Sequence, residues 1–393
     1  MAVEARQAGE AEVIDGTVRP SALRIGPLEV WPPVVLAPMA GVTNAPFRRL
    51  CRRYGAGIYV SEMVMARALV EGSERTERMV DFPADESPRS IQLYGVDPSD
   101  VGRAVRLLGG AGRVDHIDLN FGCPAAKVMR KGGGAAIPVH RRLLRSIIAA
   151  AVAAAGPYGV PVTVKFRLGL DDGVSTHLAT GRIAEDEGAS AVALHARTAE
   201  QHYSGAANWS AIAALKGHVT SIPVLGNGDV FAGVDGVRMM AETGCDGVVV
   251  GRGCLGRPWL FRDLVDACEG RAVRTPPLLA EVAVVMAEHA RLLAAWFDEQ
   301  KGCREFRKHA GWYLKGYPVG PEVRRRFGLV ESLGQLDDLL AGLDPHLEIV
   351  PGGERLVRGH TNGPRRPVLP EGWLDSVDDP SPPVGAEVAV SGG

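Results

Sequence analysis

Short apolar runs rich in β-branched residues alternate with amphipathic stretches along the chain as far as Arg271. Most of these runs are apolar at consecutive positions, which is typical of strands that are buried on both faces. Helix-start signals lie between them, such as the polar cap and early proline of Asn44-Ala45-Pro46. The predicted strands cover residues 34–40, 57–63, 90–95, 116–121, 162–168, 191–196, 223–226 and 247–251.

Eight alternations of strand and helix predict an α/β fold, and more specifically a (β/α)8 TIM barrel. A doubly wound open sheet is the competing topology. The barrel is favoured because unusual polar residues and glycines stand where nearly every predicted strand ends. The C-terminal strand ends of a barrel all face one site, so these residues would meet there.

The pattern changes after Arg271, where Thr275-Pro276-Pro277 breaks the chain and no further convincing strand follows. Helical periodicity covers 281–300, 305–316 and 333–343, and it predicts a small all-helical domain. Pro, Gly, Ser and Asp dominate from Pro351 onward, which is typical of disorder. We therefore expect a disordered extension at 1–20, a barrel at 21–272, a helical domain at 273–350 and a disordered tail at 351–393.

The formal net charge of -2 excludes a globally basic nucleic-acid binder but leaves room for a local basic face. None of the six cysteines forms a C-x-x-C pair, which argues against zinc fingers and iron–sulfur centres, so no metal is expected. Residues 1–20 lack the features of a secretory signal, and no apolar run approaches the ~20 residues of a membrane span. We expect a cytoplasmic protein with reduced thiols and no membrane contact.

Cationic side chains interrupt the fifth predicted strand at Lys165 and Arg167. Burying an unpaired lysine costs several kcal/mol, so an anionic partner is expected. For Lys165 alone, a structural ion pair or a side chain that reaches out of the barrel is an equally good interpretation. Arg167 shares its face by the period of two, and this favours a cationic site.

Glycine-rich loops follow the seventh and eighth predicted strands, at Gly226-Asn227-Gly228-Asp229 and Gly251-Arg252-Gly253. Loops at these two positions of a barrel commonly cradle a phosphate, because glycine lets backbone N–H groups approach the anion. Simple tight turns are the alternative. Two such loops at adjacent strands favour the phosphate site.

Cys123 stands on a turn between Gly122 and Pro124, at the end of the fourth predicted strand. Most lone cysteines fill space in a core, but the surroundings of Cys123 are polar and rich in glycine. An ordinary thiol, with a pKa near ~8.5, is mostly protonated at neutral pH. Cys123 can therefore serve as an acid as well as a nucleophile.

Several motifs occur in an order that resembles one enzyme family. They are Ala37-Pro38-Met39-Ala40-Gly41-Val42-Thr43, Asn120-Phe121-Gly122-Cys123-Pro124, Val164-Lys165-Phe166-Arg167, His195-Ala196-Arg197-Thr198, Gly226-Asn227-Gly228-Asp229 and Arg307-Lys308-His309-Ala310-Gly311-Trp312-Tyr313. Together they resemble the bacterial tRNA-dihydrouridine synthases, the B-type branch above all, from about Arg24 to about Gly334. Ala126 departs from the family, which frequently has a lysine there.

The resemblance implies a tRNA-binding flavoprotein oxidoreductase of tRNA processing, with FMN as the prosthetic group and NADPH (an NADP coenzyme) as the reductant. Reduced FMN would pass a hydride from N5 to C6 of a uridine in tRNA, and Cys123 would protonate C5 to give dihydrouridine. Asn120, Arg167 and Tyr203 would hold the uracil edge. The residues implied around the cofactor are Pro38, Met39, Ala40, Gln92, Lys165, His195, Asn227, Gly228, Asp229, Gly251 and Arg252.

A stacked uridine is inaccessible, so the target base would have to swing out into the barrel mouth. The helical domain would grip the RNA, since Arg304, Arg307, Lys308, Lys315 and the run 324–326 concentrate there. A solvated face is the alternative for such a charge run. We expect the protein to act on tRNA as a monomer.

Two rival functions remain. An FMN-dependent dehydrogenase of free pyrimidines would share the barrel and the cysteine turn, but it has no need of a basic helical domain. A non-catalytic RNA-binding barrel would need neither Cys123 nor Lys165 nor the phosphate loops.

Overall fold

Eight parallel strands close into a barrel in which neighbours in sequence are neighbours in space. The computed structural model describes residues 13–14, 17–18, 20–359 and 363–383. The barrel strands are β5 (Val34–Leu36), β6 (Ile58–Met65), β7 (Ser90–Tyr94), β8 (His116–Phe121), β9 (Val162–Arg167), β10 (Ala191–His195), β11 (Val224–Asn227) and β12 (Gly247–Val250). Both ends of each strand lie within two residues of the predicted ends, except in β5, which begins as predicted but ends four residues earlier. The prediction of a (β/α)8 barrel is confirmed.

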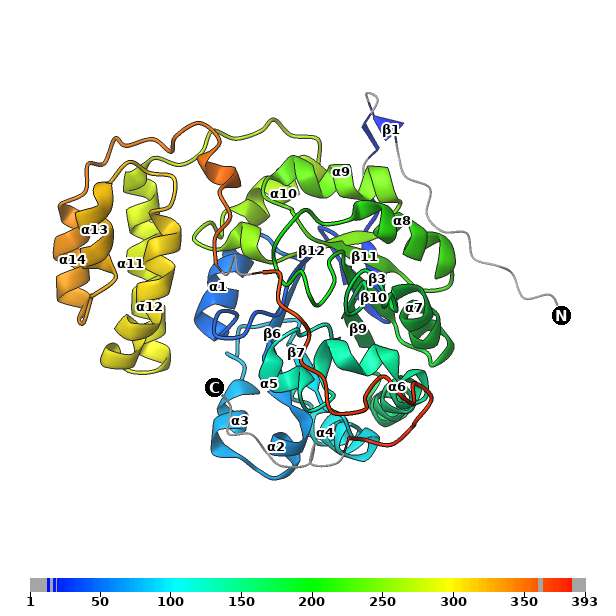
Figure 1. Cartoon of the computed structure of the whole chain (residues 1–393). Helices are drawn as coiled ribbons and strands as arrows, with labels where there is room; N and C mark the ends of the chain where they lie inside the picture. The colour runs from blue at the N-terminus through cyan, green and yellow to red at the C-terminus, as the bar shows by residue number, and fades with distance from the viewer. Residues whose placement is uncertain (1–12, 15–16, 19, 360–362, 384–393) are drawn as a thin grey trace.

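Helices surround the barrel and cover the outward faces of its strands (Figure 1). The cap expected at Asn44 forms, because its side chain accepts a hydrogen bond from Phe47 N at 3.1 Å at the start of α1. The main helices are α1 (Ala45–Arg53), α4 (Pro98–Gly110), α6 (Arg141–Ala155), α7 (His177–Asp186), α8 (Trp209–His218), α9 (Gly233–Thr243) and α10 (Leu260–Cys268). Shorter ones are α2 (Ala66–Val70), α3 (Glu74–Met79), α5 (Ala126–Met129) and the 3-10 turns η1 (Gly134–Val139), η2 (Gly156–Tyr158) and η3 (Arg252–Cys254).

A β-hairpin that the sequence analysis did not predict closes the floor of the barrel. Its strands β3 (Leu23–Ile25) and β4 (Leu28–Val30) pair antiparallel, and their buried side chains pack against inward-facing residues of the barrel. A second short pair, β1 (Val13–Ile14) with β2 (Thr17–Val18), lies before it. The predicted disorder of residues 1–20 falls mostly outside the described residues.

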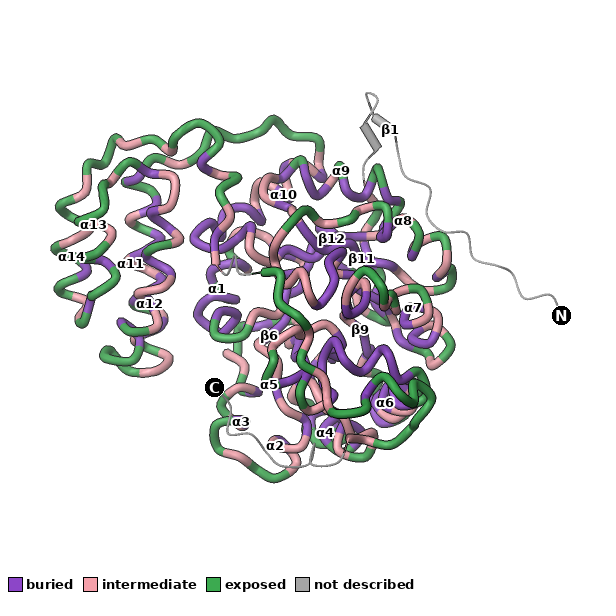
Figure 2. The backbone as a smooth tube through the Cα atoms, in the orientation of Figure 1, coloured by how far each residue is buried: buried purple, intermediate pink, exposed green. Residues whose placement is uncertain are grey.

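Four helices after the barrel form the predicted helical region. They are α11 (Leu279–Trp296), α12 (Glu299–Tyr313), α13 (Gly320–Phe327) and α14 (Leu333–Ala341), of which α13 was not predicted. They share a hydrophobic core of their own, while much of α13 and α14 is exposed (Figure 2). The region docks on α1, where the Phe47 ring lies 5.7 Å from the rings of both His289 and His309.

The prediction of a disordered tail is wrong for the described residues 351–359 and 363–383. A 3-10 turn, η4 (Gly353–Arg355), begins this segment, and it then crosses the front of the barrel in orange and red (Figure 1). Arg358 and Trp373 are only 2% and 6% exposed. A Pro- and Gly-rich composition disfavours helices and strands, but single large side chains still anchor the segment.

No helix in the described part of the chain is long and apolar enough to cross a membrane.

A buried ion pair ties α1 to the loop before β7. Arg48 Nη2 donates to Glu86 Oε2 at 2.9 Å, and Arg48 Nη1 donates to Thr43 O at 2.8 Å. Both charged side chains are 3% exposed. In such a pair each charge depends on its partner, because neither has access to water.

Removing one partner is expected to destabilise the barrel strongly. Glu86→Ala leaves the Arg48 guanidinium buried without its carboxylate, and such a change costs about 3–5 kcal/mol of unfolding free energy. Asp337→Ala breaks the exposed pair of Arg291 and Asp337 and is expected to cost less than about 1 kcal/mol. Urea unfolding followed by circular dichroism measures both, and equal losses would contradict this expectation.

Candidate active site

The C-terminal ends of the barrel strands gather the polar residues that the sequence singled out. Lys165 and Arg167 lie in β9, Asn120 in β8 and His195 at the end of β10. The other predicted site residues line the same rim: Pro38, Met39 and Ala40 after β5, Gln92 in β7, Cys123 after β8, Tyr203 after β10, Asn227, Gly228 and Asp229 at the end of β11, and Gly251 and Arg252 after β12.

Three adjacent strands carry buried polar side chains at alternating positions, so that these side chains face the barrel interior. We call this set the polar column: Ser90 and Gln92 of β7, His116, Asp118 and Asn120 of β8, and Thr163 of β9. The sequence analysis named only Gln92 and Asn120 among them.

The lower part of the column begins at Ser90, whose Oγ lies 2.7 Å from His116 Nδ1. His116 Nε2 lies 2.9 Å from Thr163 Oγ1, which in turn donates to Asp118 Oδ1 at 2.6 Å. Burial lowers the pKa of His116 to about 4, so its ring is neutral and carries one N–H. The contacts assign that proton to Nε2, since Thr163 Oγ1 is left to accept it.

The upper part of the column leads to the turn of Cys123. Gln92 Nε2 donates to Asp118 Oδ2 at 2.7 Å, and Asn120 Nδ2 donates to Gln92 Oε1 at 2.8 Å. Asn120 Oδ1 then accepts hydrogen bonds from the backbone N–H groups of Gly122 and Cys123, at 3.0 and 2.9 Å. The amide of Gln92 is therefore engaged at both ends within the column, while Asn120 shapes the cysteine turn.

The carbonyl side of Cys123 is held by the loop that follows. Ala135 N donates to Cys123 O at 3.1 Å. Gly134 adopts φ +57°, and a Cβ at this position would lie 2.5 Å from Cys123 O, so only glycine fits. Burial raises the pKa of the Cys123 thiol, so the sulfur keeps its proton at neutral pH.

Lys165 reaches across the barrel to β11. Its Nζ donates to Asn227 Oδ1 at 2.9 Å, and Asn227 Nδ2 donates to Val249 O at 2.7 Å. Burial, reinforced by the charge of Arg167 and opposed by that of Asp118, lowers the pKa of Lys165 to about 8. The lysine is mostly charged at neutral pH and becomes neutral in mildly alkaline solution.

His195 lies beside these cations. Burial, followed by the charges of Arg167 and Lys165, lowers the pKa of His195 well below its usual value. Its imidazole is therefore neutral and can donate or accept a hydrogen bond without adding charge.

The Tyr203 ring contacts two guanidinium groups. Arg167 Cζ stands 5.6 Å and Arg252 Cζ 4.8 Å from the ring centroid, within the range of cation–π contacts. Arg167 also joins two loops, because it donates to Gly122 O after β8, and to Thr198 O and His202 O after β10, at 2.8, 2.9 and 2.8 Å. It thereby connects the cysteine turn to the loop of Tyr203.

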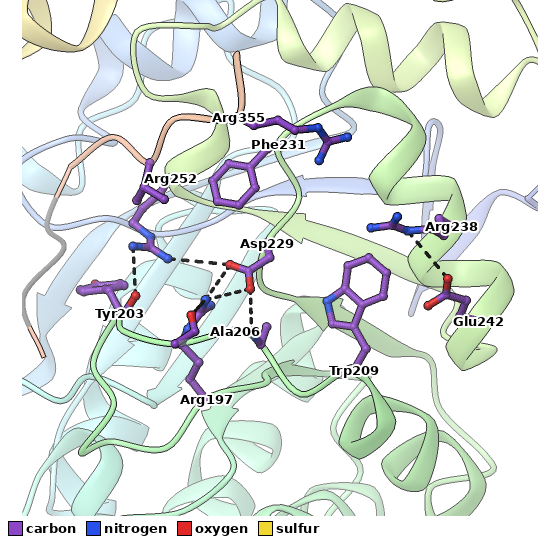
Figure 3. A pocket seen from close by; sticks show the side chains of 13 residues that line it. Arg197, Tyr203, Ala206, Trp209, Asp229, Phe231, Arg238, Glu242, Arg252 and Arg355 are labelled. Carbon is purple, nitrogen blue, oxygen red and sulfur yellow. Dashed lines mark hydrogen bonds and ion pairs between the residues drawn. The ribbon is translucent and has the colours of Figure 1, made fainter. Parts of the chain in front are cut away.

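A cavity of about 700 Å³ opens at the ends of β10, β11 and β12 (Figure 3). Arginine dominates the charged part of its lining. Arg197, Arg238, Arg252 and Arg355 face two acids, Asp229 and Glu242. The excess of cations suits an anionic ligand.

Asp229 forms an ion pair with Arg197 at the cavity. Its two oxygens accept from Arg197 Nη2 at 2.6 and 2.8 Å, and one of them also accepts from Ala207 N at 2.6 Å (Figure 3). A carboxylate repels a phosphate, so the side chain of Asp229 does not bind the anion. It orients Arg197 and the 205–207 loop instead, and any contact of Asp229 with a phosphate is made by its backbone.

One buried hydrogen-bond donor beside the cavity lacks an acceptor among the described residues. Arg197 is 2% exposed, and its Nη1 has no hydrogen-bond partner among the described residues. Gly228 lies next to it at φ +136°, where a Cβ would stand 2.6 Å from Ala207 Cβ and 3.5 Å from Arg197 Nη1. A phosphate group would fit here, because it could accept a hydrogen bond from Arg197 Nη1 and approach the backbone closely at Gly228, which has no side chain.

Sequence reasoning missed several residues of this site. Arg197 was noted only as part of a motif, and its role in the cavity depends on contacts across strands. Asp118 and His116 could have been found from the period of two in β8. Arg355 and Val357, which also line the cavity, come from the segment predicted to be disordered.

Among the residues that the structure describes, no group of three or more His, Cys, Asp or Glu side chains could hold a metal ion.

Comparisons with known proteins agree with this geometry. The model of the dihydrouridine synthase (Dus) family matches residues 35–344. A probable tRNA-dihydrouridine synthase of Mycobacterium tuberculosis is 55% identical over 384 residues, which cover 96% of this chain and 98% of the relative. A tRNA-dihydrouridine synthase B of Pseudomonas putida is 40% identical and covers 79% of this chain and 91% of its own.

The chain belongs to the dihydrouridine synthase family. The resemblance seen in the sequence motifs is thus confirmed, and the mycobacterial relative is more similar to this chain than the B-type one. Among solved structures, histamine dehydrogenase from Rhizobium sp. 4-9 superposes with a TM-score of 0.51 at 14% identity. That match covers 83% of this chain and 65% of the longer dehydrogenase, and it supports the barrel fold alone.

The charge state of Lys165 predicts how flavin binding in this dihydrouridine synthase family member depends on pH. The lowered pKa means that the cation is present below pH 8 and lost as the pH rises through about 8. The affinity for a flavin is therefore expected to fall between pH 7 and pH 9.5, and Lys165→Met is expected to bind the flavin weakly and without this dependence.

Fluorescence titration with FMN measures both affinities. Lys301→Ala, which removes an exposed lysine of the helical domain, should retain the wild-type profile. A Lys165→Met variant with the same pH dependence as wild type would contradict the role of Lys165.

Proposed function

We propose that this protein is a flavin-dependent tRNA-dihydrouridine synthase that uses FMN and takes its electrons from NADPH. It reduces the C5=C6 bond of specific uridines in tRNA. The observation that carries the proposal is a protonated thiol, Cys123, fixed on the rim of a barrel that also holds Lys165 and an unsatisfied arginine. Family membership supports the same reaction.

Cys123 supplies the proton that C5 of the uracil ring gains. Its raised pKa keeps the thiol protonated at neutral pH, as a general acid requires. Asn120 and Ala135 hold the backbone on either side of the sulfur, so the acid is fixed in place. Arg167 Nη2 has no hydrogen-bond partner among the described residues, which leaves a donor for a uracil carbonyl oxygen.

FMN, when bound, supplies the hydride for C6. Pro38, Met39 and Ala40 would line its ring from β5, and His195 would lie beside the ring. Lys165 would stabilise negative charge on the ring, while Arg197, Arg252 and the backbone at Gly228 and Gly251 would hold its phosphate. Gln92 would reach the ring only by giving up a contact with Asp118 or Asn120.

The substrate uridine must leave its stack to reach Cys123. The helical region was predicted to grip the RNA, but several of its cations serve the fold. Arg324 donates to Leu314 O and Tyr317 O, and Lys315 donates to Val357 O. Arg304 and Arg326 are exposed and form no ion pair among the described residues, so we assign them to RNA contact.

Replacing the acid is expected to separate the two half-reactions. Purified Cys123→Ala should stay yellow and be reduced by NADPH at the wild-type rate. Its formation of dihydrouridine in an unmodified tRNA transcript should fall roughly 100-fold or more, the usual loss for a general acid. Mass spectrometry of the digested tRNA measures the product.

Cys268→Ala removes a buried cysteine of α10 that lies away from the rim and serves as the control. Full dihydrouridine formation by Cys123→Ala would remove the assignment of the acid. Turnover of free uracil by the wild-type protein, with none on tRNA, would point to a free-pyrimidine dehydrogenase instead.

A further inference from the structure

The described residues 351–359 and 363–383 form a strap that connects the helical region to the loop after Cys123. In Figure 1 it runs in orange and red from η4, across the front of the barrel, to α6. The family model ends at residue 344, so the strap lies outside the part of the chain that defines the family.

The strap is anchored firmly at its start. The buried guanidinium of Arg358 donates to Trp312 O at 3.1 Å and to Lys315 O at 2.8 Å, both at the end of α12. Lys315 Nζ donates back to Val357 O at 2.6 Å. These contacts join the strap to the helical region at the end of α12.

The middle of the strap runs beside the loop of Tyr203. Arg365 N donates to Glu200 O at 2.8 Å. A Cβ at Gly363 would lie 2.4 Å from Gln201 O and 2.8 Å from Ser204 Oγ, so the two backbones touch.

The far end of the strap docks through Trp373. Its indole Nε1 donates to Ala136 O at 3.0 Å, and its ring centroid lies 3.8 Å from that of His140. His140 Nε2 lies 2.7 Å from Trp373 O. A Cβ at Gly132 would stand 2.7 Å from the Trp373 ring, so the indole fills the space over this loop.

This docking point and the contact that holds Cys123 lie on adjacent residues of η1. Trp373 bonds to Ala136 of η1, and the preceding Ala135 donates to Cys123 O. The residue before that, Gly134, lies against the same carbonyl and the Cys123 Cβ. All of η1 is buried, so a shift at one residue is transmitted to the next.

We propose that Trp373 is a positioning residue for Cys123: it holds η1 in the place that aims the thiol at the uracil ring. The inference rests on the proposed function, because it assumes that Cys123 is the proton donor. It extends that function to a segment of the chain that the family's own motifs do not include.

The test uses the flavin-loaded full-length protein and separates three steps. Cofactor reduction by NADPH is measured first. The enzyme is then reduced with dithionite and mixed with unmodified tRNA, so that flavin oxidation reports the step that needs the proton. The rate at which iodoacetamide alkylates Cys123, followed by peptide mass spectrometry, reports the placement of the sulfur without turnover.

Trp373→Ala is expected to leave reduction by NADPH unchanged and to slow the tRNA-dependent oxidation by about 10- to 100-fold, the cost of a misplaced catalytic group. Trp373→Phe, which keeps an aromatic ring but loses the bond to Ala136 O and part of the indole, should slow it about 2- to 10-fold. Alkylation of Cys123 should accelerate severalfold in Trp373→Ala, since η1 is freer to move. Leu374→Ala, at the exposed neighbouring position, should match wild type in all three measurements.

A double variant decides whether the effect passes through the cysteine. In a Cys123→Ala background, Trp373→Ala should cause no further loss, because the acid it positions is gone. An equal loss in both backgrounds, or unchanged oxidation and alkylation in Trp373→Ala, would overturn the inference. A wild-type protein that makes no dihydrouridine would instead overturn the proposed function.

Discussion

Every polar side chain inside the barrel needs a partner, and this requirement shapes the site. Unpaired polar groups in a dry interior cost about 1–3 kcal/mol each, so the polar column has to be satisfied from one end to the other. It begins at Ser90 on the floor and ends at the backbone of Cys123, with each member bonded to the next. Because no member can move without stranding its neighbours, the cysteine turn inherits the rigidity of the barrel.

Charge is distributed unevenly around this column. Lys165, Arg167, Arg197 and Arg252 converge on the rim, while Asp118 and Asp229 are the acids close to them. Burial lowers the pKa of Arg167 to about 10 and raises that of Asp118 to about 6, so both signs of charge are costly here. Burial, reinforced by the surplus of cations, lowers the pKa of His195 and keeps its ring neutral. An anionic ligand would balance the excess positive charge. It could also accept a hydrogen bond from Arg197 Nη1, which has no partner among the described residues.

The sequence predicted what depends on local pattern and missed what depends on contact. All eight barrel strands were found, because continuous apolar runs such as Val248-Val249-Val250 have few other uses in a soluble fold. The floor hairpin was missed, since three-residue strands carry almost no periodicity. His116 and Asp118 were read as part of a buried strand. The period of two places them on one face with Asn120, but only the structure shows their bonds across strands. Asp229 was assigned to a phosphate from its loop, yet its oxygens hold Arg197.

The tail shows most clearly why composition alone misleads. Its Pro and Gly content argues against helices and strands, and apart from the short turn η4 the described tail has neither. Order there depends on a few large side chains: Arg358 donates to a backbone carbonyl group of the helical region, and Trp373 donates to one of η1. The mycobacterial relatives match 91–96% of this chain, whereas the B-type ones match only 79–83%. Since the family model stops before the strap, the way in which the loop after Cys123 is held is a feature on which members of the family can differ.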